Sequence, residues 1–254
     1  MRITFLGTGT SHGVPMIGCG CATCRSQDPR DRRSRPSVFV EPDDGGAILI
    51  DAGPDLRGQA LAHDVVRVDA IVFTHGHADH ILGLDDVRRY NHLMKRPMAC
   101  YADGLTVHDI RRLFAYVFDP ATPRGGGVPQ IDLFEIHGPF SLGRQEVIPV
   151  PVMHGERPIL GYRFGGFAYL TDCSEIPDGS WPLLQDLEVL VLDALRERPH
   201  PTHFSLSEAV QVAQRVGARH TYFTHMCHDL PHAETCARLP PDTELAYDGL
   251  RVQC

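Results

Sequence analysis

The sequence predicts one mixed α/β domain over residues 1–254, and three observations support this prediction. A length of 254 residues fits a single enzyme-sized domain. With 43% hydrophobic and 22% charged residues, the chain has enough apolar material for a folded core, which excludes a disordered or fibrous protein. Patterns typical of strands and of helices alternate along the chain, and neither a repeat nor a low-complexity tract divides it.

The N-terminal half is predicted to be rich in β-structure. Short β-branched or alternating segments bounded by Gly, Pro or Asp predict strands at residues 2–6, 37–41 and 47–51. The continuous apolar segment 69–74 predicts a buried strand, and the spacing of apolar residues in 81–93 predicts a helix. The residues between these two elements therefore form a turn from a strand into a helix.

The C-terminal half continues the alternation. Helices are expected at 104–117 and 205–217, and the second opens with a capping box formed by Ser205 and Glu208. Two loop-rich stretches do not have the composition of an interdomain linker: 11–36 and 119–130. Further strands are expected near residues 132–136, 145–153, 159–164, 167–171, 188–193, 219–224 and 244–248.

Charge and composition exclude several classes of protein. The chain has 24 basic and 32 acidic residues, a net charge of −8, which argues against a protein that coats duplex nucleic acid. Residues 1–5 predict a strand rather than a signal peptide, and no apolar segment approaches the length of a membrane span. We therefore expect a cytoplasmic protein with no membrane partner, in which the eight cysteines do not form a disulfide scaffold.

The strongest chemical signal is a run of histidines directly after the predicted strand 69–74. Three imidazoles and one carboxylate occur within residues 75–80: His75, His77, Asp79 and His80. Such groups suit zinc, manganese or iron, and a single turn that carries all four can supply two metals. The alternative is a helix-capping or solvated turn, but so many ligand-type residues at a strand end have little purely structural use.

A second cluster lies in the loop at about residues 11–36. Cys19, Cys21 and Cys24 have the spacing Cys-x-Cys-x-x-Cys, which predicts a metal-binding knuckle. The alternative is a set of free thiols.

The run from Thr74 to His80 resembles the His-x-His-x-Asp-His signature of the metallo-β-lactamase superfamily of binuclear hydrolases. Further positions match the pattern of that family, each at the end of a predicted strand: Asp51 before Ala52-Gly53, His154 in VMHGE, Asp172 in AYLTDCS and His225 in YFTHMCH. The resemblance implies a four-layer αββα sandwich and a metal-dependent hydrolase.

By this resemblance, the chain holds two catalytic divalent metals, either zinc or manganese. The first would be bound by His75, His77 and His154 and the second by Asp79, His80 and His225, while Asp172 bridges both. Asp51 would support the histidine-rich turn from behind. Taken alone, His154 is as well explained as a core or surface histidine and Asp172 as a turn residue, but the order of the whole set favours ligands.

The first 37 residues resemble the PhnP-type phosphodiesterases, which are phosphoribosyl cyclic phosphodiesterases. The resemblance rests on Gly7-Thr8-Gly9-Thr10-Ser11, on the segment from Gly18 to Cys24, and on Arg33, Arg35 and Ser37. It implies a structural zinc on Cys19, Cys21, Cys24 and His228, which braces the fold without reacting. It also implies that His203, which binds no metal, is catalytic together with Asp79 and Asp172.

The implied function is hydrolysis of a small phosphodiester, such as a cyclic phosphate of a phosphorylated ribose, by a metal-bridged hydroxide. The imidazolium of His203 would stabilise the phosphoryl oxygens or protonate the leaving group. The alternatives are a thioester or lactam hydrolase, an RNA-processing nuclease, which the net charge disfavours, and a non-catalytic zinc module or cofactor-biosynthesis protein. The expected partner is the small substrate, and a homodimer is left open. The arginines of residues 25–35 form either a solvated loop or a phosphate-collecting patch.

Overall fold

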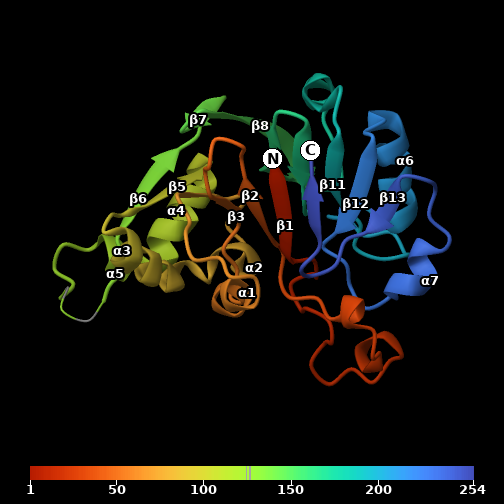
Figure 1. Cartoon of the computed structure of the whole chain (residues 1–254), viewed down its shortest axis with the longest axis horizontal. Coiled ribbons are helices and arrows are strands. Elements are labelled where there is room, and N and C mark those ends of the chain that lie inside the picture. The colour runs from red at the N-terminus through yellow and green to blue at the C-terminus, as the bar shows by residue number, and fades with distance from the viewer. Residues whose placement is uncertain (124, 126) are drawn as a thin grey trace.

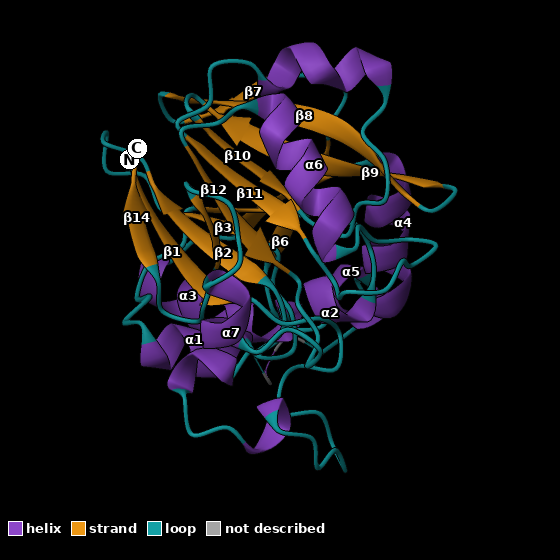
Figure 2. Ribbon diagram, turned by 90° about the vertical axis from the view of Figure 1, so that its right-hand side faces the viewer, coloured by secondary structure: helices purple, strands orange, loops and turns teal. Residues whose placement is uncertain are grey.

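The computed structural model describes residues 1–123, 125 and 127–254. Two seven-stranded sheets pack face to face. Helices cover the outer face of each sheet, so that the layers follow in the order helix, sheet, sheet, helix (Figure 1, Figure 2). The predicted four-layer αββα sandwich is confirmed.

The first sheet combines the N-terminal part of the chain with its last strand. Each neighbouring pair among β14, β1, β2 and β3 is antiparallel, whereas each neighbouring pair among β3, β4, β5 and β6 is parallel. In spatial order the strands are β14 (Arg251–Gln253), β1 (Arg2–Gly7), β2 (Ser37–Glu41), β3 (Ile48–Ile50), β4 (Ala70–Val72), β5 (Met98–Ala102) and β6 (Ile131–Glu135).

The second sheet repeats this plan with the rest of the chain. Its first four strands along the sequence are antiparallel, and its last four run parallel. In spatial order the strands are β13 (Thr243–Leu245), β12 (His220–Thr224), β11 (Val189–Asp193), β10 (Phe167–Leu170), β9 (Arg157–Phe164), β8 (Gln145–His154) and β7 (Phe140–Leu142).

The helices form the two outer layers. On the side of the first sheet lie α1 (Leu56–Ala62), α2 (Ala78–Ile81), the 3-10 turn η3 (Leu84–Val87), α3 (Arg88–Met94), α4 (Gly104–Leu113) and α5 (Ala115–Phe118). On the other side lie the 3-10 helix η5 (Asp178–Leu184), α6 (Leu206–Val216) and α7 (His232–Cys236). The capping box predicted at Ser205 and Glu208 is present at the start of α6. The loop 11–36 contains only two short 3-10 turns, η1 (Thr23–Arg25) and η2 (Pro29–Asp31), and projects from the body of the molecule.

Three apolar clusters hold the four layers together. One lies between the first sheet and its helices, and another lies between the second sheet and its helices. The third fills the space between the sheets and includes Phe5, Ile50, Phe164 and Tyr169. Between the sheets, the hydroxyl of Tyr162 donates a hydrogen bond of 2.6 Å to the carbonyl of Phe73, so the edge that carries the histidine run is tied to the opposite sheet.

The predicted helices of the first half are shorter in the structure than the sequence suggests. The segment 81–93 divides into the end of α2, η3 and α3, because the backbone N–H of Gly83 donates to the carbonyl of Ala52 instead of continuing the helix. A β-carbon at Gly83 would meet the carbonyl oxygen of Gly53 at 1.9 Å, so this close approach requires glycine. The predicted helix 104–117 breaks at Phe114. The loop predicted at 119–130 includes residues 124 and 126, which lie outside the described residues.

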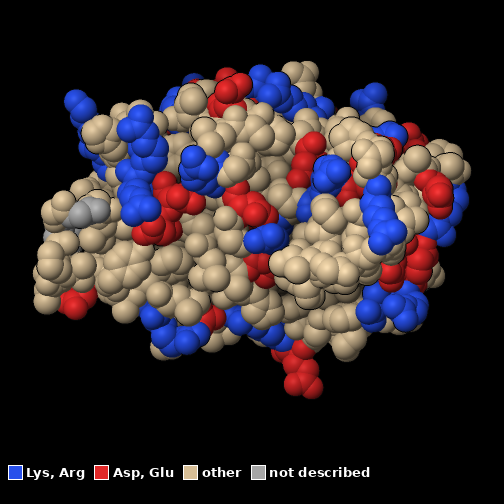
Figure 3. All heavy atoms as spheres, turned by 90° about the horizontal axis from the view of Figure 1, so that it is seen from below, with Lys and Arg blue, Asp and Glu red and all other residues tan. Residues whose placement is uncertain are grey.

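The described residues contain no helix that combines the length and apolar character needed to cross a membrane. Figure 3 views the molecule from the side on which the loop 11–36 projects in Figure 1. Basic and acidic side chains are interspersed over this face, and its described residues form no continuous basic surface.

Candidate metal centre

The candidate site lies where strands of both sheets end. Asp51 and the histidine run follow the parallel strands β3 and β4, while Asp172 and His225 follow β10 and β12 of the parallel part of the second sheet. The carboxyl ends of parallel strands meet at one edge, which is where α/β folds bind their ligands. The structure brings together all the residues that the resemblance nominated as catalytic ligands, and the assignment of ligands to them stays a prediction.

The first group of side chains is His75, His77, His154 and Asp172, whose potential ligand atoms all lie within 4.8 Å of one another. The Nε2 atom of His75 is 2.9 Å from Nδ1 of His77 and 3.6 Å from Oδ2 of Asp172. The Nδ1 atom of His154 lies 2.8 Å from the carbonyl of Thr202 and donates to it, which leaves Nε2 as the lone-pair nitrogen of that ring.

The second group is Asp79, His80, Asp172 and His225, again with ligand atoms within 4.8 Å of one another. The Nε2 atom of His80 is 3.4 Å from Oδ2 of Asp79 and 3.4 Å from Oδ1 of Asp172. The Nε2 atom of His225 is 3.2 Å from the same oxygen of Asp172 and 3.5 Å from Asp79. Asp172 therefore faces one group with Oδ2 and the other with Oδ1, as a bridging carboxylate must.

A divalent metal fits the second group because this group leaves buried nitrogens without partners. The Nε2 atoms of His80 and His225 are buried and have no hydrogen-bond partner, although both residues are almost completely enclosed. Burying an unpaired polar atom is costly, and a metal ion at the shared carboxylates would satisfy both nitrogens. A donor set of imidazoles and carboxylates suits zinc and manganese.

The electrostatics of the two groups also suit cations. Burial lowers the pKa of all three histidines in the first group, which favours the neutral imidazole that binds a metal. Burial acts in the same direction on His80, but the carboxylates of Asp172 and Asp79 outweigh it and raise the pKa of that ring. The second group therefore favours a positive charge at its centre, which a divalent cation supplies.

Asp51 supports the histidine run from behind, as the resemblance implied. Its carboxylate accepts hydrogen bonds of 2.8 Å from the backbone N–H and the hydroxyl of Thr74, and it lies 2.8 Å from Nδ1 of His80. This contact fixes the ring of His80 so that Nε2 points toward the other ligands. A β-carbon at Gly53 would lie 2.1 Å from the carbonyl oxygen of Asp79, so glycine is required for the two segments to pack this closely.

Three residues of the site have left-handed backbone conformations. Asp51, Asp172 and His225 have φ values of 61°, 55° and 59°, and each lies one or two residues after the end of a strand. Such conformations cost about 1–3 kcal/mol each in a residue other than glycine, and they cluster at functional sites. Here the change of direction after each strand accompanies the placement of Asp172 and His225 in the second ligand group and of Asp51 behind His80.

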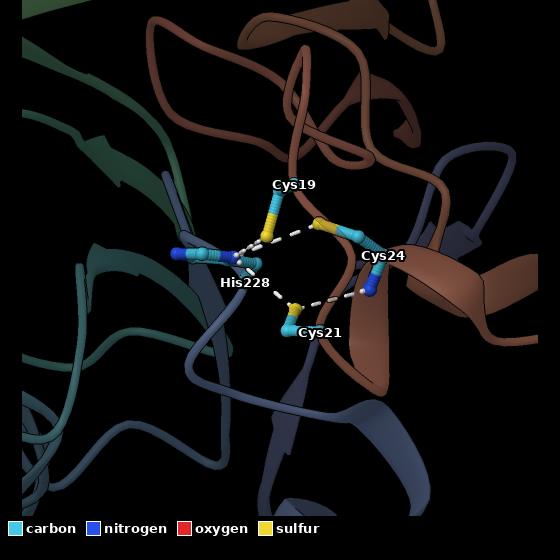
Figure 4. Close-up of side chains that lie close together, drawn as sticks. All are labelled: Cys19, Cys21, Cys24 and His228. Atoms are coloured by element: carbon cyan, nitrogen blue, oxygen red, sulfur yellow. Dashed lines mark hydrogen bonds between the residues drawn. The ribbon is translucent and has the colours of Figure 1, made fainter.

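The side chains of Cys19, Cys21 and Cys24, on the projecting loop, lie around the ring of His228 (Figure 4). The Sγ atoms of Cys19, Cys21 and Cys24 lie 3.2, 3.3 and 3.6 Å from Nδ1 of His228. The backbone N–H of Cys24 donates to Cys21 Sγ and lowers the pKa of the Cys21 thiol to about 6, which favours the thiolate that binds metal. Three sulfurs around one imidazole nitrogen are the donors that a closed structural zinc site uses, and a zinc ion at this site stays a prediction.

A buried arginine of the loop holds the segment that carries His228. The side chain of Arg33 is fully enclosed, and its guanidinium donates to the carbonyls of Cys227 and Leu230, on either side of His228. The other arginines of the loop include Arg30, which pairs with Asp28 at 2.7 Å, and Arg35, which pairs with Asp55 at 3.2 Å. These pairings favour a structural role for the loop arginines over a phosphate-collecting patch.

If the knuckle binds a metal ion, replacing one of its cysteines should lower both the metal content and the thermal stability. Cys24→Ser is expected to remove about one metal ion per chain and to lower Tm by roughly 10 °C, because the bound metal contributes directly to folding. Metal analysis and thermal unfolding measure both effects. Cys254→Ser, at a half-buried thiol outside the knuckle, is the matched control. Unchanged metal content in Cys24→Ser would contradict a metal at this site.

His203 lies beside both groups of ligands without belonging to either predicted set. Its ring centroid is 4.8 Å from that of His154 and 4.9 Å from that of His225, and the ring is stacked on the latter. Its Nδ1 lies 3.1 Å from Oδ2 of Asp193, so Nδ1–H donates to this carboxylate and Nε2 is left to accept a proton. Burial lowers the pKa of His203, so the ring is neutral at pH 7 until it takes up that proton.

The sequence analysis missed Asp193. This carboxylate is completely buried at the end of β11, and burial raises its pKa. Besides holding His203, it accepts from the backbone N–H of Phe204 at 3.2 Å and lies 3.6 Å from Nδ1 of His225. The signal was available, because an apolar strand that ends in Asp is the same pattern that singled out Asp51.

Asp193→Asn is expected to lower kcat about 10- to 100-fold, because it weakens the orientation of the His203 ring. If Asp193 acts through His203, the same substitution will have little further effect in a His203→Ala background. Steady-state kinetics of the two single variants and the double variant test this. Additive losses, or a loss of metal in both backgrounds, would show instead that Asp193 acts through His225.

Comparison with known proteins identifies the family. A sequence model of the β-lactamase superfamily domain matches residues 47–226. The chain belongs to the β-lactamase superfamily. The solved structure of a diphosphatase from the PhnP family has 50% sequence identity to this chain and a TM-score of 0.92. The match covers 99% of this chain and 97% of the diphosphatase chain. The prediction of a PhnP-type metallo-β-lactamase is therefore confirmed.

Two other similar proteins match this chain less closely: one is about twice as long, and the other has low sequence identity. An octanoyltransferase from Porphyromonas gingivalis is 39% identical over 258 residues, which cover 99% of this chain and 51% of the relative. The chain thus spans about half the length of this curated relative. Zinc-bound PqqB from Methylobacterium extorquens has a TM-score of 0.80 over the whole of both chains, but at 18% identity this likeness shows the fold alone.

Proposed function

We propose that this metallo-β-lactamase hydrolyses a small phosphodiester, with a cyclic phosphate of a phosphorylated sugar as the favoured substrate. Two observations together carry the proposal. The two ligand groups share Asp172, and the buried His203 donates from Nδ1 to Asp193 and keeps Nε2 free. This arrangement provides for metal-assisted hydrolysis and for a proton carrier, and it needs no covalent nucleophile.

The ligand groups define where the cations would be held. His75, His77 and His154 would hold one, and Asp79, His80 and His225 the other, with Asp172 shared. Two divalent cations bound there would supply Lewis-acid polarisation of the phosphoryl oxygens and activation of water.

His203 would carry the proton of the reaction. A P–O bond forms from water while the bond from phosphorus to the leaving oxygen breaks, and His203 Nε2 takes up a proton and returns it to the leaving oxygen. Asp193 would stabilise the imidazolium formed between these two transfers, because its carboxylate already contacts Nδ1.

The similarity to a PhnP-family diphosphatase supports phosphorus as the reaction centre. In a cyclic phosphodiester and at the substituted end of an organic diphosphate, the scissile phosphorus carries two bridging oxygens. A site that hydrolyses one of these groups therefore meets a phosphorus with the same number of bridging oxygens in the other. The diphosphatase widens the proposed substrates from cyclic phosphates to small organic diphosphates.

A second candidate is hydrolysis of a thioester or another carboxyl ester, since the same centre polarises a carbonyl. The similarity to an octanoyltransferase favours an acyl substrate, although the chain spans only about half of that relative. The knuckle is part of the PhnP resemblance and therefore favours a phosphodiester substrate over a carboxyl ester.

A panel of esters tests the proposal on protein purified without chelator. Bis(4-nitrophenyl) phosphate, adenosine 2′,3′-cyclic phosphate and ADP represent the phosphorus substrates, and octanoyl thioester and a chromogenic lactam represent the carbonyl substrates. Turnover of the first three that is lost on chelation and restored by zinc or manganese is expected. Activity confined to the thioester and the lactam would overturn the proposal and favour the second candidate.

A further inference from the structure

Strand β9 approaches the histidine run from the opposite sheet. The backbone N–H of Leu160 donates to the carbonyl of Thr74 at 3.1 Å, directly before His75. At the start of the same strand, Nη2 of Arg157 donates to Oδ2 of Asp109 on α4 at 3.1 Å. The hairpin of β8 and β9 is thus attached to the side of the first sheet through the main chain and also through an ion pair.

The ion pair of Asp109 and Arg157 contacts two segments that carry ligands. A β-carbon at Gly76 would lie 2.6 Å from Oδ2 of Asp109, so the carboxylate packs directly on the main chain inside the histidine run. Arg157 lies opposite His154 in the register of β8 and β9, which places the two side chains on the same face of the hairpin. The pair therefore connects the turn that carries His77 to the hairpin that carries His154.

This pair differs from an ordinary ion pair at the surface. The side chains of Asp109 and Arg157 are only 22% and 29% exposed, and Nε of Arg157 is buried without a hydrogen-bond partner among the described residues. Arg112 also faces Asp109, at 3.7 Å, but its side chain is 64% exposed. Burying an unpaired donor is unfavourable, so the position of Arg157 points to a role in the site rather than to a gain in stability.

His77 is the least constrained side chain of the first ligand group. Its Nδ1 lies 2.9 Å from Nε2 of His75, and no other polar atom of the described residues is within hydrogen-bond distance of the ring. It is also more exposed than the other members of the group. Three other histidines of the two groups have an oxygen beside Nδ1: Thr74 for His75, Asp51 for His80 and Thr202 for His154. A contact on the neighbouring main chain can supply the constraint that such an oxygen supplies elsewhere.

We propose that Asp109 and Arg157 are positioning residues of the metal centre. The pair holds the main chain at Gly76 against the β8–β9 hairpin, and it thereby keeps His77 and His154 at the separation that binding of a common cation requires. The inference rests on the proposed function, because it concerns the first ligand group of the same centre. Neither residue belongs to a ligand group, so the pair acts on ion binding through His77.

Release of zinc from the holoenzyme tests the proposal without turnover. Zinc-loaded wild type and variants are equilibrated with increasing concentrations of nitrilotriacetate, and the zinc retained per chain is measured. The main variant is Asp109→Asn combined with Arg157→Met, which leaves the net charge of the chain unchanged. We expect one ion to leave this variant at a roughly 10- to 100-fold lower chelator concentration than in wild type, the usual cost of losing a group that orients a ligand. In a His77→Ala background the same pair of substitutions should cause no further change.

The single variants separate positioning from charge. If Arg157 acted only through its positive charge, Arg157→Met would retain the ion more tightly, because like charges repel. Positioning predicts the opposite, so we expect Arg157→Met to release the ion more readily and Arg157→Lys, which keeps a donor for Asp109, to restore part of the retention. Arg112→Ala is the matched control, because it removes the exposed arginine beside Asp109 without touching the hairpin, and it should behave as wild type.

The outcomes separate this inference from the proposed function. A lower Tm of the double variant with unchanged release of every ion, or earlier release of all ions together, would assign the pair to stability alone and overturn the positioning role. Tighter retention in Arg157→Met would overturn it as well. If the zinc-loaded wild type cleaves no phosphorus substrate while the double variant still releases one ion early, the positioning role stands and the proposed function is overturned.

Discussion

Asp172→Asn is expected to lower turnover by at least about 10³-fold and to reduce the metal content from about three to about one ion per chain. The reason is that Asp172 is the one side chain shared by both groups of ligands, with a different oxygen facing each. Asparagine keeps the shape and tolerates the left-handed backbone, so the fold should persist. Metal analysis together with turnover of bis(4-nitrophenyl) phosphate measures the effect.

Asp186→Asn is the matched control for this experiment. Asp186 also has a left-handed backbone, with φ 54°, but it is exposed and lies outside the site. The control should keep full metal content and activity. A bridging role for Asp172 is excluded if Asp172→Asn keeps both catalytic metals.

His203→Ala is expected to keep all metals and to lose about 10²- to 10⁴-fold in turnover, the usual contribution of a general acid or base. The loss should depend on the leaving group. A 4-nitrophenolate leaves without help, so the aryl diester should be affected less than adenosine 2′,3′-cyclic phosphate, whose leaving oxygen is an alkoxide. Comparison of kcat for both substrates in wild type and variant tests this.

His92→Ala, on the exposed part of α3, controls for the loss of a histidine elsewhere. Equal losses on both substrates would indicate that His203 stabilises the phosphoryl oxygens instead of protonating the leaving group. Wild-type turnover in a metal-loaded His203→Ala variant would remove His203 from the reaction altogether.

The sequence indicates which residues come together in the two candidate ligand groups because these residues stand at or just after the ends of strands. The run from His75 to His80 follows β4, Asp172 follows β10 and His225 follows β12, and each strand is recognisable by its buried β-branched or aromatic residues. The end of a strand can therefore be recognised from the local sequence. The family resemblance then indicates which of these distant strand ends meet at one site.

Features that depend on contacts between distant segments could not be predicted in the same way. The helix expected over 81–93 ends where Gly83 bonds to Ala52, a contact that no helical periodicity reveals. A cavity beside His203 is lined both by His12 of the knuckle loop and by Arg196, which lies about 180 residues away along the chain. Asp193 gave a usable signal, but only its contact with His203 reveals its role.

The left-handed backbone at Asp51, Asp172 and His225 limits how the metal preference of this enzyme can evolve. Changing the preferred ion generally requires exchanging oxygen or nitrogen ligands for sulfur, or shortening and lengthening carboxylates. Aspartate, asparagine and histidine are the residues that adopt this conformation most readily, whereas cysteine and glutamate are not among them. A ligand exchange at Asp172 or His225 would thus be penalised twice, once at the ion and once in the main chain. Adaptation to another ion should begin at His77 or His154, whose backbones do not have this conformation.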